Sequence, residues 1–143
     1  MNDGDLRYAI YRAFADTGRP PTKPKLAKWC GDSATAQDAL WRLHNAHAIV
    51  LDSAGDIRMA LPFSAVETGH TVASGDRSWL ANCAWDTLAI PAALDVDATI
   101  DATWLDTGDP VDLAVVDRDL SSTAGFIHFA VPARQWWDDI VET

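Results

Sequence analysis

The sequence is organised around the stretch Asn82-Cys83-Ala84-Trp85-Asp86-Thr87-Leu88. Asn82 is a favourable N-cap residue, so this stretch predicts a helix with Cys83 in its first turn. The positive end of the helix dipole would favour the thiolate form of Cys83, which is the better nucleophile and soft-metal ligand. Asp86 follows at i+3 and should share one helix face with the sulfur. The alternative is a buried, unreactive cysteine beside a capping carboxylate.

The segments on either side of this stretch have the pattern of β-strands. Alternating apolar residues and turn signals predict strands at 70–73, 78–81, 99–104, 111–115 and 126–131. Pro91 should end or kink the helix that begins near Cys83. Pro132 should open a final short helix over 132–140, since proline is well tolerated at the first helical position.

The first 47 residues have the spacing of three helices. Apolar residues at helical period predict helices near 5–17, 23–30 and 33–47. The expected stop signals are Gly18 and Gly31, and the expected N-caps are Asp3 or Asp5, Thr22, and Asp32 or Ser33. Two strands at 48–52 and 57–61 should follow as a hairpin. Three helices and a hairpin are the winged-helix order, so we expect an N-terminal winged-helix unit.

This unit offers little for DNA recognition. The third helix supplies only Arg42, His44 and His47 as base or phosphate contacts. The other basic side chains cluster earlier, at Arg19, Lys23, Lys25 and Lys28. His44 and His47 stand at i and i+3 and could present two imidazoles to a metal, but no third ligand lies near them in the sequence. We therefore expect a packing scaffold and regard nucleic-acid binding as disfavoured.

Composition indicates an α+β protein in two units, residues 1–64 and residues 65–143. The 143 residues are 48% hydrophobic, which is enough for a core, and their formal net charge is −10. Residues 1–64 hold eight Lys/Arg and seven Asp/Glu, whereas residues 65–143 hold three and fourteen. The acidic second unit should repel polyanions.

Two cysteines, Cys30 and Cys83, are too few for a disulfide framework and are expected to be reduced thiols. With neither a long apolar run nor a signal-peptide pattern, we expect a soluble cytoplasmic protein without a membrane partner.

Three segments together resemble the organomercurial lyases (alkylmercury lyases): residues 69–72, residues 79–91 and Ile127-His128-Phe129. The resemblance implies a winged-helix-like unit in front of a catalytic core with a mixed β-sheet. It also implies protonolysis of a carbon–mercury bond. In that family a cysteine thiolate takes the mercury and a neighbouring carboxylate handles the proton, and the match gives these roles to Cys83 and Asp86.

The sequence departs from this family at one position that matters for chemistry. The family's second cysteine lies a few residues before the late His-Phe, and the corresponding stretch here, residues 121–126, has no thiol. We expect a small organometallic or soft-metal ligand held by Cys83, Asp86 and His128, and no separate cofactor. Three functions stay open: a lyase with reduced turnover, a non-enzymatic binding protein for a metal or small ligand, and a winged-helix regulator. The oligomeric state is open too, and Trp136 and Trp137 are expected to be buried within the chain.

Overall fold

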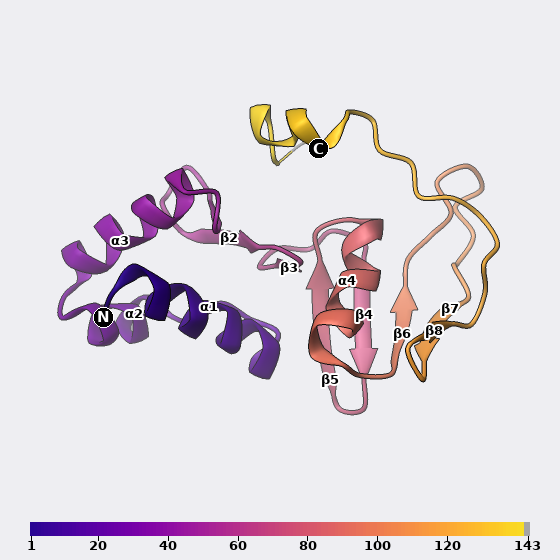
Figure 1. The fold of residues 1–143 in the computed structure, drawn as a ribbon, viewed down its shortest axis with the longest axis horizontal. Helices are drawn as coiled ribbons and strands as arrows, with labels where there is room; N and C mark the ends of the chain where they lie inside the picture. The colour runs from indigo at the N-terminus through magenta and orange to yellow at the C-terminus, as the bar shows by residue number, and fades with distance from the viewer. Residues whose placement is uncertain (142–143) are drawn as a thin grey trace.

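The computed structural model describes residues 1–141 and shows an α+β protein in which helices pack on one antiparallel sheet (Figure 1). Its helices are α1 (Asp3–Thr17), α2 (Lys23–Cys30), α3 (Ser33–Asn45), α4 (Ala84–Leu94) and the 3-10 helix η1 (Ala133–Asp138). Its strands are β1 (Val50–Leu51), β2 (Ile57–Ala60), β3 (Phe63–Ser64), β4 (Thr71–Ser74), β5 (Arg77–Ala81), β6 (Ala98–Asp101), β7 (Leu113–Val116) and β8 (Asp119–Leu120). They lie in the order β1-β2-β3-β5-β4-β6-β7-β8.

The N-terminal part has the predicted order of three helices and a hairpin. Asn2, rather than Asp3 or Asp5, caps α1, and the side chain of Asp32 caps α3 as expected. Thr22 is the N-cap residue of α2 but makes no capping hydrogen bond with its side chain. The order of elements agrees with a winged helix, and that finer assignment stays a prediction.

Strand β3 connects the N-terminal hairpin to the rest of the sheet. It pairs with β2 on one side and with β5 on the other, so the sheet is continuous across residues 64 and 65. The sequence did not predict this strand, because two residues give no visible period. The division into units 1–64 and 65–143 stays a prediction, although both contribute strands to one sheet.

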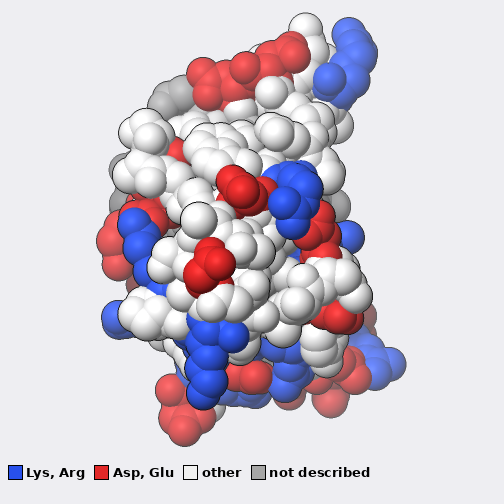
Figure 2. Space-filling view, turned by 90° about the vertical axis from the view of Figure 1, so that its left-hand side faces the viewer, with Lys and Arg blue, Asp and Glu red and all other residues white. Residues whose placement is uncertain are grey.

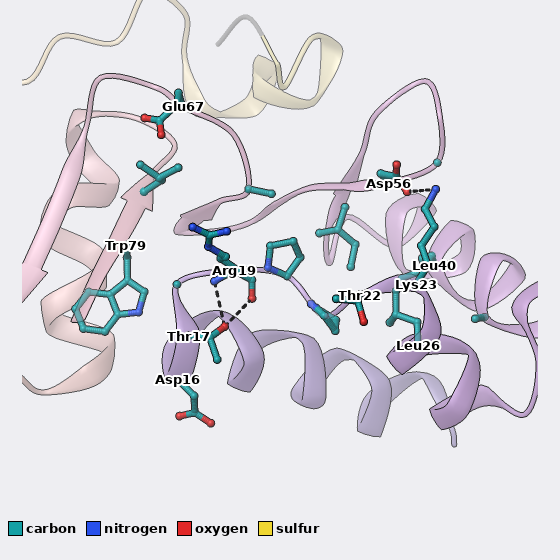
Figure 3. Close-up of a pocket in the computed structure, with 18 of the residues that line it drawn as sticks. Asp16, Thr17, Arg19, Thr22, Lys23, Leu26, Leu40, Asp56, Glu67 and Trp79 are labelled. Atoms are coloured by element: carbon teal, nitrogen blue, oxygen red, sulfur yellow. Dashed lines mark hydrogen bonds and ion pairs between the residues drawn. The ribbon is translucent and has the colours of Figure 1, made fainter. Parts of the chain in front are cut away.

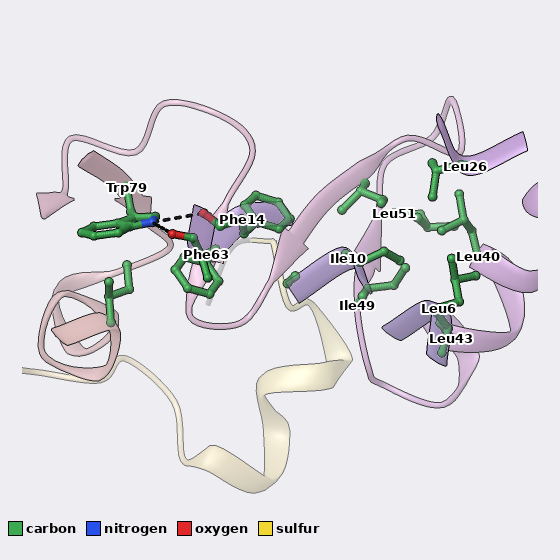
Figure 4. Close-up of a cluster of buried hydrophobic side chains, with 14 of the residues drawn as sticks. Leu6, Ile10, Phe14, Leu26, Leu40, Leu43, Ile49, Leu51, Phe63 and Trp79 are labelled. Carbon is green, nitrogen blue, oxygen red and sulfur yellow. Dashed lines mark hydrogen bonds between the residues drawn. The ribbon is translucent and has the colours of Figure 1, made fainter. Parts of the chain in front are cut away.

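The core joins α1 to β5 (Figure 4). The rings of Phe14 and Phe63 stack with centroids 5.6 Å apart. The indole N–H of buried Trp79 donates to the carbonyl oxygens of Phe14 and Ala15, at 3.0 and 3.1 Å. These carbonyls belong to the last turn of α1, where the helix itself supplies too few donors. Trp79 therefore fixes β5, the strand that leads into the Cys83 segment, against α1.

The C-terminal half differs from the sequence predictions in three details. Pro91 was expected to end or kink its helix, and it does not end it: α4 continues to Leu94, and its C-cap residue Asp95 has φ 53°. Proline at this position removes one helical hydrogen bond, but Ile90 and Pro91 are both buried, and this burial compensates. Residues 126–131 form no strand, because this segment packs Phe129 against Trp85 of α4 instead of pairing with a sheet edge. The final helix is a 3-10 helix.

The surface around α2 and α3 carries both signs of charge (Figure 2). Arg42, the main basic side chain of α3, makes a bidentate contact with Asp3 at 2.9 and 2.8 Å. Lys23 pairs with Asp56 at 2.7 Å. These pairs reduce the positive potential that a phosphate backbone would meet, and the expectation against nucleic acid stays a prediction. Within residues 1–141, none of the helices is both long and apolar enough to cross a membrane.

Candidate thiol and carboxylate site

Cys83 and Asp86 lie together where β5 passes into α4. Cys83 is the N-cap residue and Asp86 is in the first turn, so the helix starts one residue later than predicted. The thiol sulfur of Cys83 lies 3.6 Å from Oδ2 of Asp86 and donates a hydrogen bond to it. The predicted juxtaposition of sulfur and carboxylate is thus present in the structure.

The expected bias toward thiolate is wrong. Burial raises the pKa of the Cys83 thiol, and the carboxylate charge of Asp86 raises it further. The backbone N–H groups of Asp86 and Trp85 act in the opposite direction without reversing the shift. Burial also raises the pKa of Asp86, partly offset by hydrogen bonding from Cys83 and Asn82. The pair therefore retains protons more strongly than either group would in water.

Asn82 is not the N-cap residue of α4, although the sequence predicted it to be. It precedes the N-cap residue, and both polar atoms of its amide are shielded from solvent without a hydrogen bond of normal geometry. The amide is nevertheless close enough to Asp86 to lower the pKa of that carboxyl group. Sequence reasoning missed this role, because an asparagine before a helix is first interpreted as a cap.

The structure does not bring His128 into the site. His128 is exposed in the segment that was expected to be a strand. Within residues 1–141, no three His, Cys, Asp or Glu side chains are grouped to hold a metal ion, so the expected set of Cys83, Asp86 and His128 is not assembled. Cys30 ends α2, which lies well apart from α4 (Figure 1).

His44 and His47, the two histidines at i and i+3, each contact other parts of the chain. Nδ1 of His44 accepts a hydrogen bond from the backbone N–H of Leu51 at 3.2 Å. His47 stacks on Trp137, with ring centroids 3.9 Å apart and planes 4° from parallel. Trp136 and Trp137 are only partly buried within the chain, so the burial predicted for them is met in part.

A wide groove lies elsewhere (Figure 3). It has a volume of about 990 Å³ and runs between the α1–α2 connector and the β4–β5 hairpin. Its walls include Arg19, Lys23 and Arg77 beside Asp56 and other carboxylates, so it has no single charge preference. Neither Cys83 nor Asp86 lines it, and its chemistry does not point to a reaction.

Two comparisons with known proteins found similar proteins. Residues 63–143, more than half of the chain, match the family described as MerB, alkylmercury lyase. A solved structure described as the mercury-bound form of MerB2 is similar at a TM-score of 0.67 and 27% identity. That similarity covers 85% of this chain and 59% of the solved one, so the chain spans well under two thirds of its relative. No curated protein matches. By its sequence match over the segment that contains the Cys83 and Asp86 pair, the chain belongs to the alkylmercury lyase family.

Proposed function

We propose that this protein captures organomercury compounds at Cys83 and cleaves their carbon–mercury bond with the proton of Asp86. The observation that carries the proposal is the 3.6 Å separation between the Cys83 sulfur and the Asp86 carboxylate at the start of α4. Thiolates prefer soft metals, and a carboxyl group whose pKa is raised by burial is suited to hold and return a proton.

The first step is capture. As the sulfur of Cys83 bonds to the mercury of R–Hg⁺, the thiol proton passes to the carboxylate of Asp86, which already accepts its hydrogen bond. The product is a neutral R–Hg–S adduct beside a protonated carboxyl group. Transfer to an adjacent base avoids releasing the proton into a partly buried site, where a free charge is costly.

The second step is cleavage. Asp86 returns its proton to the carbon of R, the electron pair of the carbon–mercury bond forms the new C–H bond, and R–H leaves. Mercury(II) is left on the Cys83 sulfur, where the Asp86 carboxylate is free to coordinate it. Because Cys30 is the only other cysteine and lies on α2, an external thiol would have to supply a second soft ligand.

That shortage of soft ligands favours a second function, capture without turnover. Within the described residues no third metal-binding side chain joins Cys83 and Asp86. Stoichiometric binding of an organomercurial needs only one sulfur, whereas repeated cleavage also requires removal of mercury(II). We expect turnover to be slow or absent unless external thiol is present.

The first prediction tests both steps on methylmercury. Cys83→Ser should abolish the adduct at residue 83, because a hydroxyl is a hard, protonated donor. Asp86→Ala should preserve the adduct and lower methane release by roughly 100-fold or more, as expected for removal of a proton donor. Peptide mass spectrometry locates the adduct at Cys83 or at Cys30, and headspace gas chromatography measures methane, each with and without external thiol.

Cys30→Ser is the matched control, because it removes the other thiol and leaves the pair intact. It should behave like the wild type in both measurements. Adducts confined to Cys30, or methane release that survives Cys83→Ser, would overturn the assignment of Cys83.

A further inference from the structure

Helix α4 is apolar on every side, although the rest of the chain covers only part of it. Asp86 is its only charged residue. The helix packs on β4 and β5 and buries Ile90 and Pro91, whereas Ala92 and Ala93 are exposed (Figure 1). A helix that is apolar all round is normally covered all round. The outer side of α4 therefore has the character of a contact surface.

A cavity of about 630 Å³ extends this outer side toward the edge of the sheet, and we call it the α4–β8 groove. Its floor is apolar and comes from α4, the turn after it and the β7–β8 hairpin. The floor residues are Leu88, Pro91, Ala92, Val96, Val115 and Leu120. Leu120 lies on β8, the last strand of the sheet, and is 44% exposed. Apolar surface that is exposed and continuous over several elements commonly marks an interaction site.

The rim of the α4–β8 groove is acidic. Asp95, Asp97 and Asp117 line it together with Arg118. Asp95 pairs with Arg118 at 2.7 Å, so these two charges offset each other. Within the described residues, Asp97 and Asp117 form no ion pair with a basic side chain, and Asp97 accepts a hydrogen bond from the backbone N–H of Asp117 at 2.9 Å. The rim thus keeps two uncompensated negative charges beside an apolar floor.

We propose that the α4–β8 groove binds a partner protein through an amphipathic helix that carries Lys or Arg beside its apolar stripe. The stripe lies against α4 and Leu120, and the basic side chains pair with Asp97 and Asp117. A second copy of this chain fits less well, because it also has a formal net charge of −10 and its own groove has the same acidic rim. The proposal is independent of the reaction at Cys83.

The test uses two synthetic helical peptides and no mercury compound. Both peptides carry leucine at i, i+3, i+4 and i+7, and their remaining positions are lysine in one and glutamate in the other. Fluorescence anisotropy measures binding at physiological ionic strength, where long-range attraction between exposed charges is screened. The protein should bind the lysine peptide at least about tenfold more tightly than the glutamate peptide.

The floor is tested by a single substitution. Ala92→Lys places a cation where the apolar stripe of the peptide lies, and should weaken binding of the lysine peptide by about tenfold or more. Ala54→Lys is the matched control, because it makes the same substitution at an exposed position between β1 and β2. It should keep the wild-type affinity.

The rim is tested by removing its two uncompensated charges. The double variant Asp97→Asn and Asp117→Asn should weaken binding by roughly threefold or more, since exposed ion pairs each contribute modestly. Asparagine also tolerates the positive φ of 52° at residue 117. The double variant Asp76→Asn and Asp106→Asn is the control, because it removes two exposed carboxylates that do not line the groove. It should leave the affinity unchanged.

Equal affinity for the two peptides would overturn the proposal. Equal losses in Ala92→Lys and Ala54→Lys would also overturn it, because binding would then follow the net charge of the protein and not the groove. Sedimentation velocity tests the alternative occupant. A wild-type dimer that Ala92→Lys dissociates would show that a second copy covers the groove, against the proposal.

Discussion

The Asp86 carboxylate opposes ionisation of the Cys83 thiol, whereas the hydrogen bond from the thiol favours ionisation of Asp86. Burial is the first cause of the raised pKa of Cys83, and the adjacent carboxylate adds to it both as a charge and as a hydrogen-bond acceptor. A thiol in this state is less reactive toward ordinary electrophiles near neutral pH than a free cysteine. Under the proposed function, a soft metal displaces this proton from the thiol.

The second prediction concerns the pH dependence of Cys83. Its rate of alkylation by iodoacetamide should rise with pH through an inflection above that of a free thiol, because the thiolate is the reacting form. In Asp86→Asn the inflection should move to lower pH, since removal of a negative charge stabilises the thiolate. Peptide mass spectrometry after timed labelling measures Cys83 separately from Cys30.

Asp38→Asn provides the control for this prediction, because Asp38 is an exposed carboxylate on α3. In this variant, the pH dependence of Cys83 alkylation should match that of the wild type. An inflection that stays in place, or moves to higher pH, in Asp86→Asn would show that Asp86 does not set the Cys83 pKa.

At the scale of elements, α1 and β5 depend on one glycine. Gly18 ends α1 with φ 69°, and a Cβ atom there would collide with the carbonyl oxygen of Ser78 on β5. Gly69 also has positive φ, 75°, but a Cβ atom there would meet nothing within 4 Å. A side chain at Gly69 would cost only backbone strain, whereas one at Gly18 would cost backbone strain and a steric clash.

The third prediction follows from this comparison. Gly69→Ala should lower the free energy of unfolding by about 1 kcal/mol, the cost of left-handed backbone in a residue with a Cβ atom. Gly18→Ala should lower it by roughly 3 kcal/mol, because β5 must also move away from α1. Urea denaturation measures both. Equal losses would mean that the α1–β5 contact adjusts without cost.

The sequence correctly predicted those features that a few neighbouring residues determine. Gly18 and Gly31 end their helices as predicted, and Asp32 caps α3 as one of the two expected N-caps. The i+3 spacing of Cys83 and Asp86 placed sulfur and carboxylate together, since three residues make nearly one helical turn. Each of these outcomes depends on a few consecutive residues.

The wrong predictions concern features that depend on distant partners. The pKa of Cys83 follows burial by surrounding elements, which the sequence of α4 does not contain. His128 alternates with apolar neighbours like a strand residue, but no strand forms there and Phe129 contacts Trp85 instead. Strands β3 and β8 have two residues each, too few to show a period.

At the scale of the whole molecule, the site depends on the continuity of the sheet. Strand β5 carries the chain into Cys83, and it is held by β4 on one edge and β3 on the other. The indole N–H of Trp79, on β5, also donates to two carbonyl oxygens in the last turn of α1. The position of the thiol is therefore set partly by residues before position 65, although the segment matched to the family model begins at residue 63.

The last prediction is that the chain unfolds as one unit and that neither part folds alone. Removing residues 1–64 would strip β3 from β5 and expose Trp79, whose side chain is 1% exposed in the intact chain. Removing residues 65–143 would leave β3 with one partner strand and the carbonyl of Ala15 without the indole N–H.

The full chain should show coincident thermal transitions by tryptophan fluorescence and far-ultraviolet circular dichroism. The fragments 1–64 and 65–143 should show broad or absent transitions, and mixing them should restore part of the signal. Two separated transitions in the full chain, or a sharp transition in fragment 1–64, would instead establish an independent N-terminal domain, and the placement of Cys83 would then have to be explained by residues 65–143 alone.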